Sequence, residues 1–548
     1  MGSLRLFHAL TFLLLIQIPA LNAFAKSSSL TVNPKAPKGG VVNLNLWGEP
    51  PTLNPFASTD VYASKIQDLV LESLLERDGN TRQPKSRLAE KWEISKDHTV
   101  YTFHLRKNVK FHDGQPFTAE DVKFSFDAIF DPKFKAMHRQ PSFDGIAKVE
   151  VVDPMTVKVT TKNTYFLNFD SIAYDLRIVP KHVYEDANNS AKNRLLIGTG
   201  PYILDKFDPG QRLVLKRNLQ WYGFSTADWQ GYYNFDQMNY RFVKDENVTL
   251  ELLKKGDLDF CWLSPEGFAT KTQDPPWGKS VFKTQVENSS PKGFGYVGFN
   301  LHKTLFADKN VRLALASLMN REEMNKKFRF GKDLLATGPF YQQSEYASKK
   351  VKPIQYDPQK ALQLLNKAGW KDDDKTGVLH KMVDGKSQDF HFTLLYTVKD
   401  LEKYLTIFKE DLKKVGVQMD LQILEWNSFL KLLHDGNFEA TFMGWSEGMD
   451  WDPKAVWHSS SAANGGFNEV EYKNPAVDQL IDKARLETNR EERMKMMHKI
   501  YEMIAEDVPY IFMFNGRYDS YAYSNRVVRP GETMKYAIGF DTWWMANP

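Results

Sequence analysis

The sequence contains one cysteine in 548 residues, so it cannot form an internal disulfide. A disulfide framework of the kind that holds small secreted domains together is therefore excluded. The single thiol, Cys261, stands in the apolar run "LDFCWLS". It is predicted to be a buried small hydrophobe and not a reactive group.

Long blocks of one charge sign are also missing. Seventy-two Lys and Arg face 68 Asp and Glu, which leaves a net charge of +4 spread over the chain. Nucleic acid is therefore not expected as a partner. The twelve histidines show no H-x-x-x-H or H-E-x-x-H spacing, and no Walker A sequence is present. No metal site, no cofactor and no ATP hydrolysis are expected.

Only the N-terminus carries a long apolar run, at residues 9–18. Arg5 precedes it, and Ala-Phe-Ala at 23–25 follows as a cleavage site. This pattern predicts a signal peptide over residues 1–25. A membrane anchor is the alternative, but the run falls short of the ~20 residues that a spanning helix needs. With no cysteine at the cleavage point for a lipid, we expect a soluble protein exported to a Gram-negative periplasm.

What the sequence has in abundance is aromatic side chains. Trp, Tyr and Phe make up 13% of a chain that is 42% hydrophobic. The composition is that of a globular protein, and the length predicts two to four domains or lobes. Thr118 begins one amphipathic helix, and residues 474–508 read as two helices broken near Thr488 and Asn489. Strands and helices mix without a strict βαβ rhythm, which predicts α+β or mixed α/β lobes.

Two motifs suggest enzymes by their letters. Gly444-x-Ser446-x-Gly448, in "GWSEGMDWDP", spells a nucleophile elbow. That elbow needs a helix directly after the serine, and Pro453 would break it. A serine hydrolase at Ser446 is kept as the alternative from another class of function. The second interpretation is a pocket wall, because residues 445–452 hold two Trp, two Asp and a Glu.

The second motif, Gly293-x-Gly295-x-x-Gly298, matches a dinucleotide fingerprint. A dinucleotide site requires a helix to begin at once, so that its free N–H groups hold the pyrophosphate. Here "FNLHK" continues as a strand. We therefore expect a glycine-rich strand with aromatic neighbours and no nucleotide site.

The stretch "FHLRKNVKFHDGQPFTAEDVKFSF" resembles the solute-binding protein family 5, the periplasmic receptors of peptide and nickel ABC importers. "GTGPYIL", "LLKKGDLDF", "YDPQKALQLLNKAGW" and "NPAVDQLIDKARLETNREERMKMMHKIYEMIAEDVPYIF" agree in the same order along nearly the whole mature chain. The resemblance implies a receptor that captures a peptide-like solute, performs no covalent chemistry and delivers its ligand to an inner-membrane ABC permease.

The fold implied by the resemblance is an α/β, two-lobed periplasmic binding protein of the cluster C type, with mixed sheets flanked by helices and an extra domain in the first lobe. A monomer is expected. The chain should cross between lobes near Gly293–Asn300 and near Val508–Phe514. The expected division is a signal peptide at 1–25, the first lobe at 26–75, 181–292 and 511–548, the extra domain at 76–180, and the second lobe at 293–510.

The resemblance also implies ligand contacts. Peptide-binding relatives hold the ligand ammonium on an Asp just after a Gly-Trp pair, and Gly444-Trp445 matches that pair. One residue is inserted before Pro453, so Asp450 is the first candidate for this amine anchor and Glu447 the second. The remaining predicted ligand contacts are Trp445, Ser446, Gly444, Trp426 and Trp451.

One departure leaves the ligand open. Arginines that hold a ligand carboxylate in some oligopeptide-binding relatives are replaced here by Leu433 and Phe442. A clamp for short peptides of fixed length is therefore not expected. Longer or modified peptides fit this pattern, and a nickel chelate or an oligosaccharide is the alternative ligand.

Overall fold

The computed structural model describes residues 31–548 apart from 189, 374, 384 and 463–465. The predicted signal peptide at 1–25 lies outside the described residues. Within the described part of the chain, no helix combines the length and the apolar character that crossing a membrane requires. Cys261 is 1% exposed, which confirms its predicted burial.

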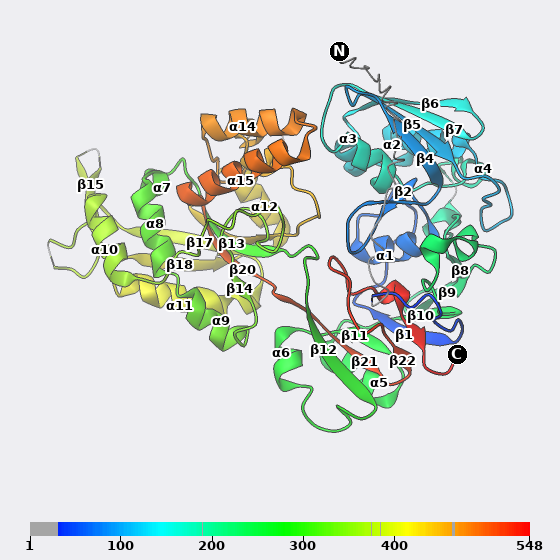
Figure 1. The fold of residues 1–548 in the computed structure, drawn as a ribbon. Helices are drawn as coiled ribbons and strands as arrows, with labels where there is room; N and C mark the ends of the chain where they lie inside the picture. The colour runs from blue at the N-terminus through cyan, green and yellow to red at the C-terminus, as the bar shows by residue number, and fades with distance from the viewer. Residues whose placement is uncertain (1–30, 189, 374, 384, 463–465) are drawn as a thin grey trace, which may run out of the picture.

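A seven-stranded sheet forms the first lobe, on the right of Figure 1. Central strand β1 runs parallel to β10 and β11, whereas the other neighbours are antiparallel. Alternate residues of β1, Val42, Leu44 and Leu46, are buried, as expected for a half-covered strand. In order across the sheet, the strands are β12 (Val281–Glu287), β21 (Tyr518–Ser524), β11 (Phe260–Trp262), β1 (Val41–Leu46), β10 (Gln237–Phe242), β9 (Arg212–Arg217) and β8 (Tyr202–Asp208).

The first lobe also contains α-helices α1, α5 and α6 and two small two-stranded sheets. The β2–β3 hairpin joins it to the extra domain, and β22–β23 lies close to the C-terminus. Their bounds are α1 (Val61–Val70), α5 (Glu246–Lys255), α6 (Pro265–Thr270), β2 (Leu75–Arg77), β3 (Pro84–Ser86), β22 (Val527–Val528) and β23 (Trp544–Met545).

The extra domain is an antiparallel four-stranded sheet with one long helix. That helix, α2, begins after Thr118 as predicted, and the Asp121 carboxylate accepts the Thr118 backbone N–H at 2.9 Å. Val122 of α2 and Val42 of β1 belong to one continuous core, so this domain packs firmly on the first lobe. Its elements are β4 (Ala89–Ile94), β5 (Val100–Leu105), β7 (Thr156–Thr161), β6 (Ile146–Asp153), α2 (Ala119–Phe130), α3 (Asn168–Asp170) and α4 (Lys181–Tyr184).

The second lobe contains a six-stranded sheet covered by helices, on the left of Figure 1. Its strands, in order, are β14 (Leu334–Leu335), β20 (Tyr510–Asn515), β13 (Phe294–Phe299), β19 (Ala440–Trp445), β17 (His391–Tyr396) and β18 (Gln418–Ile423). The glycine-rich motif lies on β13, which confirms the predicted strand as far as Phe299. The expected continuation through "FNLHK" is wrong, because residues 300–303 form a turn.

The helices of the second lobe begin directly after β13. The last two, α14 and α15, confirm the predicted pair of helices with its break at Glu487–Asn489. The other elements are α7 (Thr304–Ala307), α8 (Lys309–Leu318), α9 (Arg321–Phe328), α10 (Pro358–Lys367), α11 (Glu402–Lys413), α12 (Trp426–His434), α13 (Lys454–Trp457), α14 (Pro475–Leu486), α15 (Arg490–Asp507) and the hairpin β15 (His380–Val383)–β16 (Lys386–Asp389).

The chain passes between the two large sheets twice. The first passage is the six residues 288–293 between β12 and β13, and the second is the two residues 516–517 between β20 and β21. The predicted boundary at 292/293 falls inside the first passage. The boundary at 510/511 is wrong, because β20 pairs with β13 and belongs to the second lobe up to Asn515.

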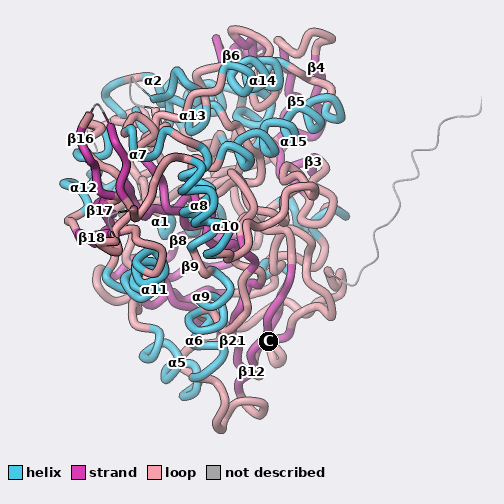
Figure 2. Tube along the Cα trace, turned by 90° about the vertical axis from the view of Figure 1, so that its left-hand side faces the viewer, coloured by secondary structure: helices cyan, strands magenta, loops and turns pink. Residues whose placement is uncertain are grey.

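The two views agree on how the lobes meet. Helices α14 and α15 lie at the same end of the molecule as the four-stranded sheet, whereas α5, α6 and β12 lie at the opposite end (Figures 1 and 2). The predicted two-lobed α/β fold with mixed sheets and an extra domain is thus the observed one.

Candidate functional site

The two passages are tied to each other by a buried polar cluster. Lys292, in the first passage, forms an ion pair with Asp519 of β21. Asn288 Nδ2 and Ser290 Oγ each donate to Asp519 Oδ2 at 2.8 Å. Side-chain exposure is only 7% for Lys292 and 21% for Asp519. We call these four residues the passage cluster; they hold the longer passage against the start of β21, directly after the shorter passage.

A second contact joins the lobes through Arg82, at the turn of the β2–β3 hairpin. Its guanidinium donates to Asp450 at 2.8 Å and lies 3.4 Å from Glu345, both in the second lobe. Tyr346 donates to the other Asp450 oxygen at 2.9 Å. The first candidate for the amine anchor is therefore already neutralised by an arginine.

The same interface continues into the extra domain. The Tyr165 hydroxyl donates to Asp452 at 2.7 Å, and Arg485 of α14 donates to the same carboxylate at 2.8 Å. The Phe166 backbone N–H bonds the Arg485 carbonyl at 3.0 Å. We call this whole set of contacts, from Arg82 to Arg485, the seam. It places the predicted site segment at a junction between the lobes.

Trp445 ends β19 and forms part of an aromatic stack in the second lobe. Its ring lies parallel to Tyr296, with centroids 6.2 Å apart, and Tyr296 stacks on Tyr510 at 3.8 Å. Gly444 pairs with Gly295 across β13 and β19. Because neither position has a side chain, a hollow of about 310 Å³ opens there, lined also by Trp445 and Phe442.

Glu447 follows Trp445 and carries the isolated carboxylate of this segment. It is half-buried, and among the described residues no group donates a hydrogen bond to it or forms an ion pair with it. Burial alone raises its pKa to about 8. An acid in that environment binds a cation strongly once one is brought beside it, because the pairing restores the charged form.

Ser446 does not sit in a nucleophile elbow. It is exposed between Trp445 and Glu447, and the next helix, α13, begins only at Lys454. No helix N-terminus therefore faces Ser446 from directly after the turn, as a hydrolase of this type requires.

The two other predicted tryptophans lie away from the hollow. Trp451 is 5% exposed and stacks on Phe340 inside the core of the second lobe, so its predicted ligand contact is corrected to core packing. Trp426, the first residue of α12, is 49% exposed and stacks on Phe429. It does not line the hollow beside Trp445.

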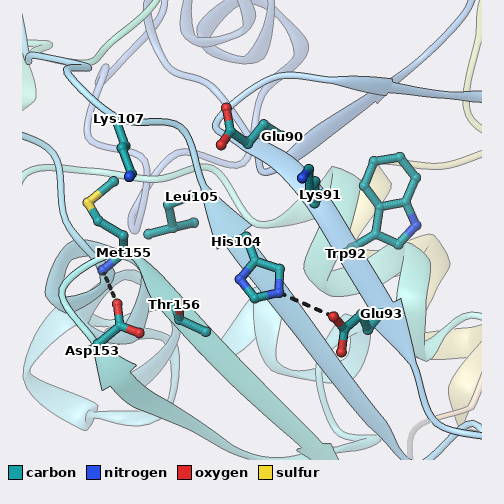
Figure 3. Close-up of a pocket in the computed structure, with 10 residues that line it drawn as sticks. All are labelled: Glu90, Lys91, Trp92, Glu93, His104, Leu105, Lys107, Asp153, Met155 and Thr156. Carbon is teal, nitrogen blue, oxygen red and sulfur yellow. Dashed lines mark hydrogen bonds and ion pairs between the residues drawn. The ribbon is translucent and has the colours of Figure 1, made fainter.

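A larger hollow lies elsewhere. A trough of about 800 Å³ follows the outward face of β4 and β5 (Figure 3). Within it, the His104 ring lies 3.5 Å from the Glu93 carboxylate. Trp92 points along this face, and no residue of the second lobe reaches it. Its size alone does not make it the site. In the described part of the chain, no group of three His, Cys, Asp or Glu could hold a metal ion.

Sequence reasoning missed the residues of the first lobe at this junction. Arg82 follows the turn "RDGN" in an otherwise ordinary polar stretch, and its φ of 60° is unusual for arginine. The only sequence signal was the Asp-Gly turn, which predicts a hairpin and says nothing of a partner more than 360 positions away.

Comparison with known proteins shows which family has this fold. The model of the bacterial extracellular solute-binding proteins, family 5, matches residues 83–467. The oligopeptide-binding protein AppA of Bacillus subtilis is 29% identical over 567 positions, covering 98% of this chain and 99% of that protein. A probable peptide-binding protein, YejA of Agrobacterium fabrum, is 26% identical over 94% of this chain and 90% of its own length.

Solved structures agree with the fold. AppA from Bacillus subtilis in complex with a nonapeptide gives a TM-score of 0.71 at 28% identity, covering 93% of this chain and all of that one. NikZ from Campylobacter jejuni in complex with Ni(L-His) gives 0.71 at 26% identity, covering 92% and 98%. The family consists of binding proteins and not of enzymes, which confirms the prediction of a receptor without covalent chemistry. The chain belongs to the bacterial extracellular solute-binding proteins of family 5, the binding components of ABC importers.

Proposed function

We propose that this protein is a periplasmic receptor that captures peptides between its lobes as a monomer and delivers them to an inner-membrane ABC permease. The observation that carries the choice of peptides is Glu447, a half-buried carboxylate without a partner among the described residues, two positions after Trp445. The full-length likeness to an oligopeptide-binding protein supports the same choice.

Glu447 replaces Asp450 as the anchor for the ligand ammonium in this proposal. Asp450 already binds Arg82 and Tyr346, so a ligand amine would have to displace a guanidinium to reach it. Glu447 has no such competitor, and an ammonium beside it lowers its raised pKa and ionises it. Lobe closure then removes water from the pair, and the ligand shifts the population toward the closed form.

The hollow beside Trp445 indicates which other groups of a ligand the site can accept. Its walls are mainly glycine backbone, aromatic rings and apolar side chains, and the Arg329 guanidinium in its lining is already paired with Asp333. Such a pocket accepts varied side chains, and the edges of β-strands supply hydrogen bonds to a peptide backbone.

The test begins with mass spectrometry of the molecules released when protein purified from cells is denatured. Peptides support the proposal, whereas only sugars or only nickel chelates would refute it. Titration calorimetry with a recovered peptide then compares the Glu447→Gln variant with Glu410→Gln, a change at an exposed acid on α11.

We expect Glu447→Gln to weaken binding at least tenfold, since losing a desolvated charge partner costs about 2–5 kcal/mol. The same peptide with an acetylated amine should lose that dependence on Glu447. Equal affinities in both variants would remove Glu447 from the anchor role.

A further inference from the structure

A second hollow, of about 200 Å³, lies at the seam between the lobes. The β2–β3 hairpin, the segment 534–541 and Met449 of the second lobe enclose it. Because residues of both lobes line it, its shape depends on how the lobes meet. The lining residues on which the inference depends are Glu76, Arg77, Asp78, Arg82, Lys85 and Asp541.

Lys85 of β3 holds its ammonium over two aromatic rings in this hollow. The nitrogen is 3.5 Å from the centroid of Trp229 and 4.0 Å from that of Tyr232. Among the described residues it has no hydrogen-bond acceptor and no ion-pair partner, and burial lowers its pKa. The rings stabilise one side of the charge, and its N–H groups remain available on the other.

Asp541 supplies the opposite charge at the same hollow. Burial raises its pKa to about 6, and no other described residue donates a hydrogen bond to its carboxylate. Lys85 lies close enough to act on it through space, but the two groups do not form an ion pair. A polar guest between them would therefore meet a donor at one end and an acceptor at the other.

The remaining charges around the hollow are already satisfied. Arg77 pairs with Asp170 at 2.6 Å, and Arg82 pairs with Asp450 across the seam. Glu76 pairs with the buried Arg87. The Asp78 carboxylate accepts two backbone N–H groups of its own turn, at 3.0 and 2.8 Å. Among the described residues that line the hollow, Lys85 and Asp541 are thus the two charged groups whose side chains form neither an ion pair nor a hydrogen bond with another residue.

This arrangement favours a ligand group without net charge. A lone anion would meet the Asp541 carboxylate, and a lone cation would meet the Lys85 ammonium, each in surroundings that screen poorly. A neutral group with one C=O and one N–H satisfies both, and leaving either unpaired costs about 1–3 kcal/mol. An amide is that group. The volume equals that of about seven water molecules at roughly 30 Å³ each, enough for an amide with its neighbouring carbons.

We propose that Lys85 and Asp541 form a subsite that binds an amide group of the ligand, with Lys85 donating to its carbonyl oxygen and Asp541 accepting from its N–H. This inference rests on the proposed peptide function. The amide comes either from the peptide backbone or from an Asn or Gln side chain. The subsite also links the lobes, because Met449 closes it only when the seam is formed.

The test uses a mixture of random-sequence nonapeptides, the peptide length in the solved AppA complex. Wild-type protein, Lys85→Met and Asp541→Asn are each incubated with the mixture, and the retained peptides are quantified by mass spectrometry. Lys91→Met, at an exposed lysine of β4, is the matched control. Melting temperatures verify folding, and Lys85→Arg keeps the charge over the rings if the methionine variant fails to fold.

We expect both variants to retain at least tenfold less peptide, and Lys91→Met to behave as wild type. Loss of an Asn or Gln preference at one ligand position identifies a side-chain amide, whereas a uniform loss identifies the backbone. Two results would overturn the subsite and leave the receptor function unaffected. One is unchanged peptide retention in both variants; the other is a wild-type preference for acidic or basic peptides that the variants lose. A wild-type protein that retains no peptide overturns the receptor function and, with it, this inference.

Discussion

Replacing Asp519 by Asn tests whether the passage cluster holds the two passages together. The substitution keeps the size of the side chain and removes its charge. The ammonium of Lys292, 7% exposed, then loses its ion-pair partner in a place where water cannot replace it. We therefore expect a large effect from a change of one atom.

The magnitude follows from burial. Removing one partner of a buried ion pair costs about 3–5 kcal/mol, and exposed pairs contribute about 0–1 kcal/mol. Asp519 is 21% exposed, and Asn288 and Ser290 still have an oxygen at position 519 to bond. The expected loss in free energy of unfolding is about 2–4 kcal/mol. Adding Lys292→Met should restore at least half of it, because no buried charge is then left over.

Urea unfolding followed by tryptophan fluorescence measures these changes. The chain offers a control in the same place, the ion pair between Arg517 and Glu287 at 3.1 Å, whose side chains are 42% and 50% exposed. Arg517→Met should leave the unfolding midpoint unchanged within error. If Asp519→Asn and Arg517→Met had equal effects, or if Lys292→Met made the Asp519→Asn protein still less stable, the reasoning would be refuted.

Three other predictions concern the site and its support. The folded pKa of Glu447, about 8, lies above its ordinary value of 4.5, so the folded protein holds that proton more tightly than the unfolded chain does. The stability of the wild type therefore falls as pH rises between these two values, whereas Gln does not titrate. From pH 5 to pH 8 the melting temperature of the wild type should fall relative to that of Glu447→Gln, and a constant difference between the two would contradict this prediction. Gly198→Ala should lower stability by more than about 2 kcal/mol in a thermal melt, because its Cβ would lie 2.1 Å from the last carbonyl oxygen of α1, whereas Gly531→Ala has open space and should not. Asp450→Asn removes the carboxylate that Arg82 bonds across the seam, so X-ray scattering of ligand-free protein should give a larger radius of gyration; an unchanged radius argues against the seam.

The parts of the fold that depend on local pattern could be predicted from the sequence. The capping of α2 at Thr118 and the break near Asn489 are set by residues within one helical turn, and both are found where expected. The strand reading of "GFGYVGF" was also correct, because the next helix, α7, begins only at Thr304 and not directly after Gly298.

The boundary of the second lobe could not be predicted in the same way. The apolar run of β20 fits either large sheet by composition. Its assignment depends on pairing with β13, more than 200 residues earlier, and no local signal carries that information.

The candidate site, too, could be predicted from the sequence only in part. The segment after Gly444 was found from its own composition, because clustered Trp and acidic residues are rare in a loop. Which acid is free could not be read, since Asp450 is neutralised by Arg82 from the other lobe. Trp451 and Trp445 look equivalent in sequence, yet one is inside the core and the other borders the hollow.

The position of β21 has a consequence for how the protein is made. This strand comes from residues 518–524, yet it lies between β12 and β11 in the interior of the first sheet. The second lobe, residues 294–515, is complete before β21 emerges from the ribosome. The first lobe, although it begins the chain, must wait for almost the last residues, with the edges of β11 and β12 unpaired until then. Truncation near the C-terminus should therefore damage the N-terminal half of the protein more than the middle, and chaperones would have most to protect there.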